Sequence, residues 1–149
     1  MKFKLIDQVL VQEPRRVVAI KNVTESEEYL SDHFPTFPVL PGVFMVEAMV
    51  QAARVLLDPT HPRQVLGSVR ALRYGSFVRP GEALQVEVEW LKSSEDGIHT
   101  FRGEGKVMVH GTSPEDFDTA VSGRFTMRSI RTDRRPAAMD LEGSVADHD

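Results

Sequence analysis

The chain of 149 residues contains no cysteine and has no excess of positive charge. The absence of cysteine excludes disulfide bonds, a thiolate nucleophile and a cysteine-ligated zinc site, and it fits a reducing cytosol. The formal net charge of −4 argues against general binding to nucleic acid, whose phosphates attract a basic surface. We therefore predict a cytoplasmic protein with no nucleic-acid partner.

Long apolar segments are also missing. The most apolar segment, from Val43 to Leu57, is interrupted by polar side chains at Glu47, Gln51 and Arg54. A membrane-spanning helix needs about 20 apolar residues. The first residues, M-K-F-K-L-I-D, are followed by polar residues and not by the apolar region of a secretion signal. We expect neither a signal segment nor a membrane partner.

What remains is the composition of one globular domain, with 41% hydrophobic and 27% charged residues. A chain of this length can bury one core and is too short for two ordinary domains. No internal repeat or linker interrupts it. We predict one domain over residues 1–131, followed by a loose tail of low hydrophobicity over residues 132–149.

The pattern of apolar residues predicts one long helix and several strands. The segment 43–57 is apolar nearly all round, which is typical of a buried helix. Apolar and polar residues alternate in 84–90 and 98–110, as in half-buried strands. Further β-rich segments at 15–23, 64–78 and 119–130 bring the total to five or six strands. A short element at 3–11 leads into the fold, and a brief helix or turn is predicted at 24–30.

These elements indicate an α+β fold in which an antiparallel sheet curls around one central helix. One sheet cannot cover such an apolar helix on all sides, so we expect a dimer. Two glycines, Gly103 and Gly105, fall on the same face of one strand and leave room there for the helix or for an acyl chain.

The candidate site lies where a loop with three prolines meets the central helix. His33 is in this loop, and imidazole titrates near neutrality, with an unperturbed pKa of about 6.5. Glu47 is the one acid in the apolar helix, and we expect it to be sequestered from water, which favours the protonated form. Gln51 follows it one turn later. The unpaired N–H groups at the start of the helix, near Gly42 and Val43, can polarise a carbonyl oxygen.

The residues from His33 to Gln51 read H-F-P-T-F-P-V-L-P-G-V-F-M-V-E-A-M-V-Q. This segment resembles the signature of the FabZ-type (3R)-3-hydroxyacyl-[acyl-carrier-protein] dehydratases, which have the hotdog fold. The resemblance extends from about Lys4 to about Ile130 and includes R-Y-G-S-F-V-R-P-G-E-A-L after the helix. Asp32 and Thr36 depart from the glycine that many members have at those positions. Gly75 and Ser76 replace residues that are commonly basic, which weakens any simple account of carrier docking.

The resemblance implies that His33 and Glu47 are catalytic and that the amides near Gly42 and Val43 hold the thioester carbonyl. In that family each active site takes its histidine from one subunit and its glutamate from the other. Homodimers are the rule there, and a trimer of dimers is common. The substrate is a 3-hydroxyacyl chain on acyl carrier protein, and we expect no cofactor and no metal.

The acyl tail is expected to lie along apolar residues of the loop and helix, although each of them could equally be core. The residues in question are Phe37, Phe44, Met45 and Met49. Three alternatives remain open: a thioester hydrolase on the same fold, a dehydratase that also isomerises the double bond, and a non-catalytic acyl-binding subunit. Glu47 speaks against the isomerising enzyme, which usually has aspartate there.

Overall fold

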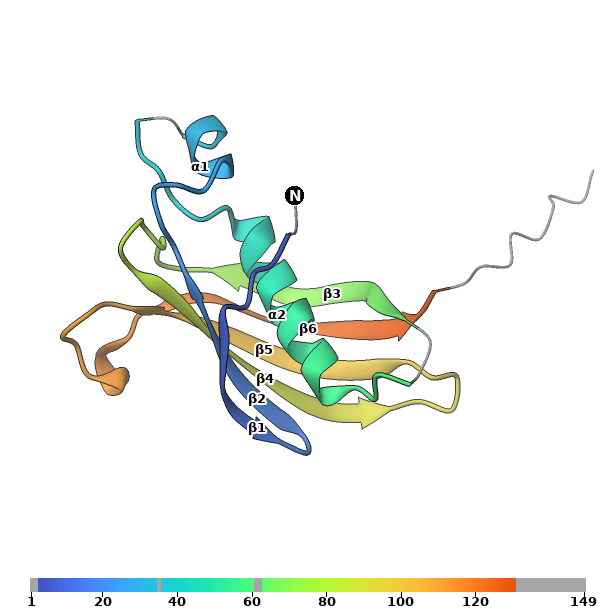
Figure 1. Cartoon of the computed structure of the whole chain (residues 1–149). Helices are drawn as coiled ribbons and strands as arrows, with labels where there is room; N and C mark the ends of the chain where they lie inside the picture. Colours follow the sequence, from blue (N-terminus) through green and yellow to red (C-terminus); the bar gives the residue numbers. More distant parts are fainter. Residues whose placement is uncertain (1–2, 35, 61–62, 131–149) are drawn as a thin grey trace, which may run out of the picture.

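The structure of the protein is a computed structural model, which describes residues 3–34, 36–60 and 63–130 (Figure 1). Its strands form one six-stranded antiparallel sheet, and its main helix lies across one face of that sheet. The predicted α+β fold is confirmed. The elements are β1 Gln8–Glu13, β2 Arg16–Asn22, α1 Tyr29–Asp32, α2 Gly42–Leu56, β3 Gln64–Tyr74, β4 Ala83–Ser93, β5 His99–Met108, the 3-10 turn Pro114–Asp116 and β6 Thr119–Ser129.

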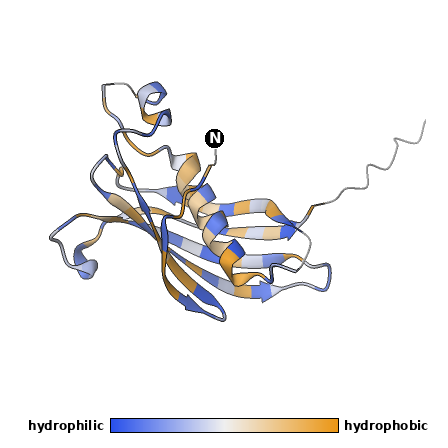
Figure 2. Ribbon diagram, in the orientation of Figure 1, coloured by the Kyte–Doolittle hydropathy of each residue, from blue (hydrophilic) through white to orange (hydrophobic). Residues whose placement is uncertain are grey.

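The strands follow one another in the order β1-β2-β4-β5-β6-β3, so β1 and β3 are the two edges. Figure 2 shows hydrophobic and hydrophilic residues alternating along the strands. Leu84, Val86 and Val88 of β4 are fully buried against α2, and the residues between them face away from the helix. The period-two alternation therefore predicted correctly which face of β4 belongs to the core.

Helix α2 packs closely on the sheet because β5 has no side chain at Gly103. A Cβ atom built there would lie 2.5 Å from the Sδ atom of Met49 and 3.2 Å from the Phe125 ring. Met49 and Phe101 are fully buried at this contact. The glycine on β5 makes room for the central helix, which was one of the two predicted reasons for its presence.

Within the short element predicted at residues 3–11, strand β1 begins at Gln8. Residues before β1 run along α2 instead, where Gln51 binds their backbone. The amide of Leu5 donates to Oε1 of Gln51 at 2.8 Å, and Nε2 of Gln51 donates to the carbonyl of Phe3 at 3.1 Å. These polar contacts with the helix take the place of ladder hydrogen bonds.

The edge strand β3 has little of its surface covered in the single chain. Most of its residues from Leu66 to Tyr74 are exposed, including the apolar side chains of Leu66, Val69 and Leu72. Strand β6 pairs with one side of β3, and the other side forms the edge of the sheet. The predicted tail, residues 132–149, lies outside the described residues.

Candidate active site

The loop before α2 places the start of the helix in an apolar hollow. Pro41 is the N-cap residue, and its carbonyl accepts hydrogen bonds from the amides of Phe44 and Met45 at 3.0 and 3.3 Å. Gly42 and Val43 are the first two residues of α2, and the first N–H groups of a helix have no intrahelical acceptor. These two amides are therefore available to a bound oxygen, at the positive end of the helix dipole.

A cavity of about 380 Å³ opens at this helix start. Four of the predicted site residues line it, namely His33, Gly42, Val43 and Met45. The other lining residues are Phe34, Val39, Leu40, Tyr74, Gly75, Ser76, Phe77 and Ala120. The cavity thus combines one imidazole, a helix N-terminus and a mainly apolar wall.

His33 follows α1 directly and is half-buried. Its amide donates to the carbonyl of Tyr29 at 3.2 Å, and its ring packs edge-on against Phe34 at 4.4 Å. Phe34 has φ of 51°, a left-handed backbone that is uncommon for a bulky residue. Nδ1 of His33 is buried and has no hydrogen-bond partner among the described residues. The imidazole therefore keeps a ring nitrogen that no protein group occupies.

Glu47 is not sequestered in the single chain, so that part of the prediction is wrong here. Its side chain is 36% exposed, and it does not line the cavity that contains His33. Nε2 of Gln51 donates to its Oε1 at 3.2 Å, and Nη1 of Arg54 lies 3.8 Å from the same oxygen. The sheet covers only one side of α2, and the side chain of Glu47 lies outside the covered side. Its polar neighbours are Gln51, one helical turn further on, and Arg54, two turns further on.

The four apolar residues predicted to line an acyl channel are found in four different places. Met45 lines the cavity, whereas Met49 belongs to the core under β5. Phe44 packs edge-on against Phe3 and Tyr29, at 4.8 Å from each ring. Phe37 is exposed and contacts the ring of Phe77, which itself lines the cavity. Phe44 and Met49 therefore do not reach the cavity of their own chain.

Sequence reasoning assigned no role to Tyr74 or Phe77, although both are cavity residues. They belong to the segment R-Y-G-S-F-V-R-P-G that carried part of the family resemblance. Aromatic residues at the end of a predicted strand are a weak indication of a binding site, and they did not predict one here. The end of β3 lies beside the start of α2, where the Tyr74 ring approaches Gly42.

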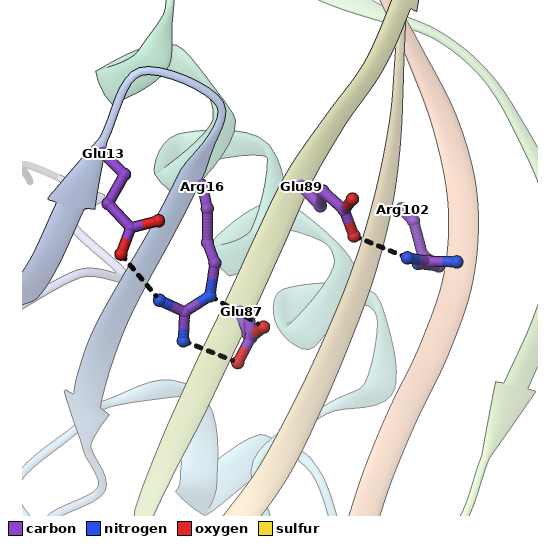
Figure 3. A network of polar contacts seen from close by, with 5 residues as sticks. All are labelled: Glu13, Arg16, Glu87, Glu89 and Arg102. Atoms are coloured by element: carbon purple, nitrogen blue, oxygen red, sulfur yellow. Dashed lines mark hydrogen bonds and ion pairs between the residues drawn. The ribbon is translucent and has the colours of Figure 1, made fainter.

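A larger hollow of about 590 Å³ lies on the opposite, charged face of the sheet. Figure 3 shows the ion pairs on this face, in which Arg16 binds Glu13 and Glu87, and Arg102 binds Glu89. Hydrogen bonds and charge from Glu87 raise the pKa of Arg16 above its ordinary value. Such exposed pairs contribute little to stability. The hollow lacks the apolar wall that an acyl chain needs.

The described residues, 3–34, 36–60 and 63–130, contain neither a metal-binding cluster nor a membrane-spanning helix. No cluster of three or more His, Asp or Glu side chains there could hold a metal ion. No helix in the same residues is long and apolar enough to cross a membrane.

Residues 10–112 match the model of the ApeI-like family, described as ApeI dehydratase. The 3-hydroxyacyl-[acyl-carrier-protein] dehydratase FabZ of Ruminiclostridium cellulolyticum is 41% identical over 120 residues, which cover 70% of this chain and 84% of that protein. The FabZ protein of Bacillus cereus is 44% identical over 112 residues, covering 72% and 74%. The chain belongs to the ApeI-like dehydratase family. The similarity of this dehydratase to FabZ proteins covers most of the chain, so the resemblance to that family seen in its sequence is confirmed.

Solved structures show the fold of this dehydratase. A chain of the dehydratase heterocomplex ApeI:P from Xenorhabdus doucetiae aligns with a TM-score of 0.60 at 21% identity, covering 86% of this chain and 99% of that one. A hypothetical thioesterase with coenzyme A from Streptococcus pneumoniae aligns with a TM-score of 0.59 at 11% identity, covering 80% and 82%. At these identities the likeness concerns architecture alone, and the predicted hotdog fold is confirmed.

Proposed function

We propose that this dehydratase removes water reversibly from a (3R)-3-hydroxyacyl thioester carried by acyl carrier protein and forms the trans-2-enoyl thioester, in fatty-acid or related acyl-chain biosynthesis. The names of its relatives at 38–44% identity support this substrate class. The observation that carries the proposal is the cavity that His33 and the amide-rich start of α2 line together. This arrangement suits proton removal next to a carbonyl.

In the first step His33 takes the proton from the carbon next to the thioester carbonyl. The electron pair of the broken C–H bond passes to the carbonyl oxygen, where the amides of Gly42 and Val43 donate hydrogen bonds. Preorganised donors of this kind are worth about 3–4 kcal/mol each when they face the developing charge. The position of His33 in the wall of the cavity that also contains this helix start supports its assignment as the base.

In the second step the bond between the carbonyl's β-carbon and its hydroxyl breaks, and the departing oxygen receives a proton from Glu47 or from a water that Glu47 binds. The electron pair of the enolate forms the new double bond, and water leaves. Gln51 and Arg54 contact the same oxygen of Glu47 and hold the carboxyl group in place. We assign Glu47 to this step although it lies outside the cavity of its own chain.

A second copy of the chain would bring Glu47 to the cavity. The edge of β3 exposes Leu66, Val69 and Leu72, and a long exposed apolar edge strand readily pairs with another strand. Pairing of two β3 edges would continue the sheet and set the two α2 helices on the same face. The site would then take His33 from one copy and Glu47 from the other, in a homodimer. Met45, Val39 and Leu40 would contact the acyl tail.

The test compares the variants His33→Ala and Glu47→Gln with the wild-type protein in the hydration of a crotonyl thioester. Both variants are expected to lose activity by at least about a hundredfold, since each lacks a proton-transfer group. Circular dichroism and thermal unfolding check that each variant is folded. If a variant is folded and keeps near-normal turnover, the role assigned to that residue is wrong. Release of free thiol without enoyl hydration would indicate a thioesterase instead.

A further inference from the structure

Tyr74, the last residue of β3, lies across the start of helix α2. A Cβ atom built on Gly42 would be 2.7 Å from Cε1, 2.8 Å from Cζ and 3.1 Å from the hydroxyl oxygen of Tyr74. The phenol can come so close only because Gly42 has no side chain. Its hydroxyl is therefore beside the backbone that supplies the two free amides, within the cavity that contains His33.

The backbone that carries Tyr74 is held firmly. Tyr74 is opposite Val121 in the ladder between β3 and β6. The next two amides, of Gly75 and Ser76, donate to the carbonyls of Ala120 and Thr119 at 2.8 and 2.9 Å. A Cβ atom on Gly75 would overlap the Thr119 carbonyl, so the backbone of the two segments is in direct contact. The position of the phenol relative to α2 thus depends on paired strands and not on a loose loop.

The hydroxyl group of Tyr74 is an unused donor. It makes no hydrogen bond to any other described residue, in a side chain that is about half exposed in the single chain. Desolvation by partial burial raises the pKa of Tyr74 above its ordinary value. A phenol with a raised pKa stays protonated at neutral pH and can donate a hydrogen bond to an oxygen in the cavity.

We propose that the Tyr74 hydroxyl is a third hydrogen-bond donor to the thioester carbonyl oxygen, beside the amides of Gly42 and Val43, and thus a further catalytic residue. This inference rests on the proposed dehydration, in which negative charge develops on that oxygen. The phenol keeps its proton throughout: it donates a hydrogen bond to the enolate oxygen and breaks no covalent bond. The donor therefore stabilises the transition state more than the bound substrate.

The decisive variant is Tyr74→Phe, which keeps the ring against Gly42 and removes only the hydroxyl. The matched control is Tyr29→Phe at the other tyrosine of the chain. The Tyr29 hydroxyl is buried with no hydrogen-bond partner among the residues that the structure describes, and its ring packs on Phe44 away from the cavity. Both variants lose one phenolic oxygen, so effects common to them report on folding. Effects confined to Tyr74→Phe report on the cavity.

Two readouts test the donor. In the hydration of a crotonyl-pantetheine thioester, Tyr74→Phe should lower kcat roughly tenfold with little change in KM, less than the 10²–10³-fold loss known for a fully buried oxyanion donor. The infrared carbonyl stretch of bound [1-¹³C]butyryl-pantetheine should lie at higher frequency in Tyr74→Phe than in the wild-type protein, since the carbonyl has lost a donor. Tyr29→Phe should match the wild type in both measurements.

Equal kcat and equal carbonyl frequency in Tyr74→Phe and the wild-type protein would overturn the inference and leave the ring as an apolar wall. The wild type and His33→Ala, assayed in the same series, separate this result from failure of the proposed function. If the wild type hydrates the thioester and His33→Ala does not, unchanged activity of Tyr74→Phe refutes the role of the Tyr74 hydroxyl and leaves the proposed dehydration standing. If the wild type hydrates nothing, the proposed dehydration fails and the inference falls with it.

Discussion

Gln51 donates a hydrogen bond from Nε2 to Oε1 of Glu47 across 3.2 Å, one helical turn along α2. The same Gln51 accepts the amide hydrogen bond of Leu5 and donates to the carbonyl of Phe3. One amide side chain therefore fastens the N-terminal segment to the central helix and also contacts the carboxylate assigned to catalysis.

The variant Gln51→Leu should destabilise the protein by about 1–3 kcal/mol, because the buried amide of Leu5 loses its acceptor and water cannot replace it. Urea denaturation measures the change in the free energy of unfolding. The control is Gln12→Leu, which removes a long 3.5 Å contact to the carbonyl of Val55 on an exposed surface and should cost less than about 0.5 kcal/mol. Equal stability of the two variants would contradict the role of Gln51.

Gly103 should tolerate no larger residue. In Gly103→Ala the new methyl group overlaps Met49 and presses on the Phe125 ring, and overpacking of a core typically costs about 1–3 kcal/mol. Its neighbour Arg102 provides the control, since it points to the charged face and forms an exposed ion pair with Glu89. Arg102→Ala should cost about 1 kcal/mol at most. A lower melting temperature for Arg102→Ala than for Gly103→Ala would contradict this packing.

The proposed dimer depends on one of the two sheet edges. Val69 on β3 and Val9 on β1 are almost equally exposed, at 38% and 37%. Val69→Asp should shift the protein to a monomer and abolish activity, because a charge on a paired edge opposes strand addition. Val9→Asp is the matched control and should leave the dimer intact. Light scattering distinguishes the states, and dissociation by Val9→Asp alone would place the interface at the other edge.

Much of the fold could be predicted from local patterns. The apolar segment 43–57 predicted α2 to within one residue at each end, since proline and glycine mark its start and Asp58-Pro59 its end. Alternation in β4 and β5 identified the buried faces. The path of residues 3–7 along α2 could not be predicted, because their partner, the side chain of Gln51, is 46 positions from Leu5 and leaves no trace in the local pattern.

The site was harder to predict than the fold. One cavity contains His33, Gly42 and Val43. A short motif could predict this, because these residues lie within eleven positions of one another in the sequence. The exposure of Glu47 could not be predicted, because a helix that is apolar nearly all round does not show which of its sides the sheet leaves uncovered. Tyr74 was missed because its contact with Gly42 joins the end of one strand to the start of a helix. Only the folded structure brings these two residues together.

The central claim is that one site contains His33 of one copy and Glu47 of another, and mixed dimers test it most directly. His33→Ala and Glu47→Gln are each expected to be inactive alone. When the two are coexpressed, a mixed dimer carries one site without either residue and one intact site, so random pairing should restore about a quarter of the wild-type hydration activity. If both residues of a site came from the same chain, no mixed dimer would contain an intact site. A coexpressed sample that forms mixed dimers and remains inactive would contradict the account.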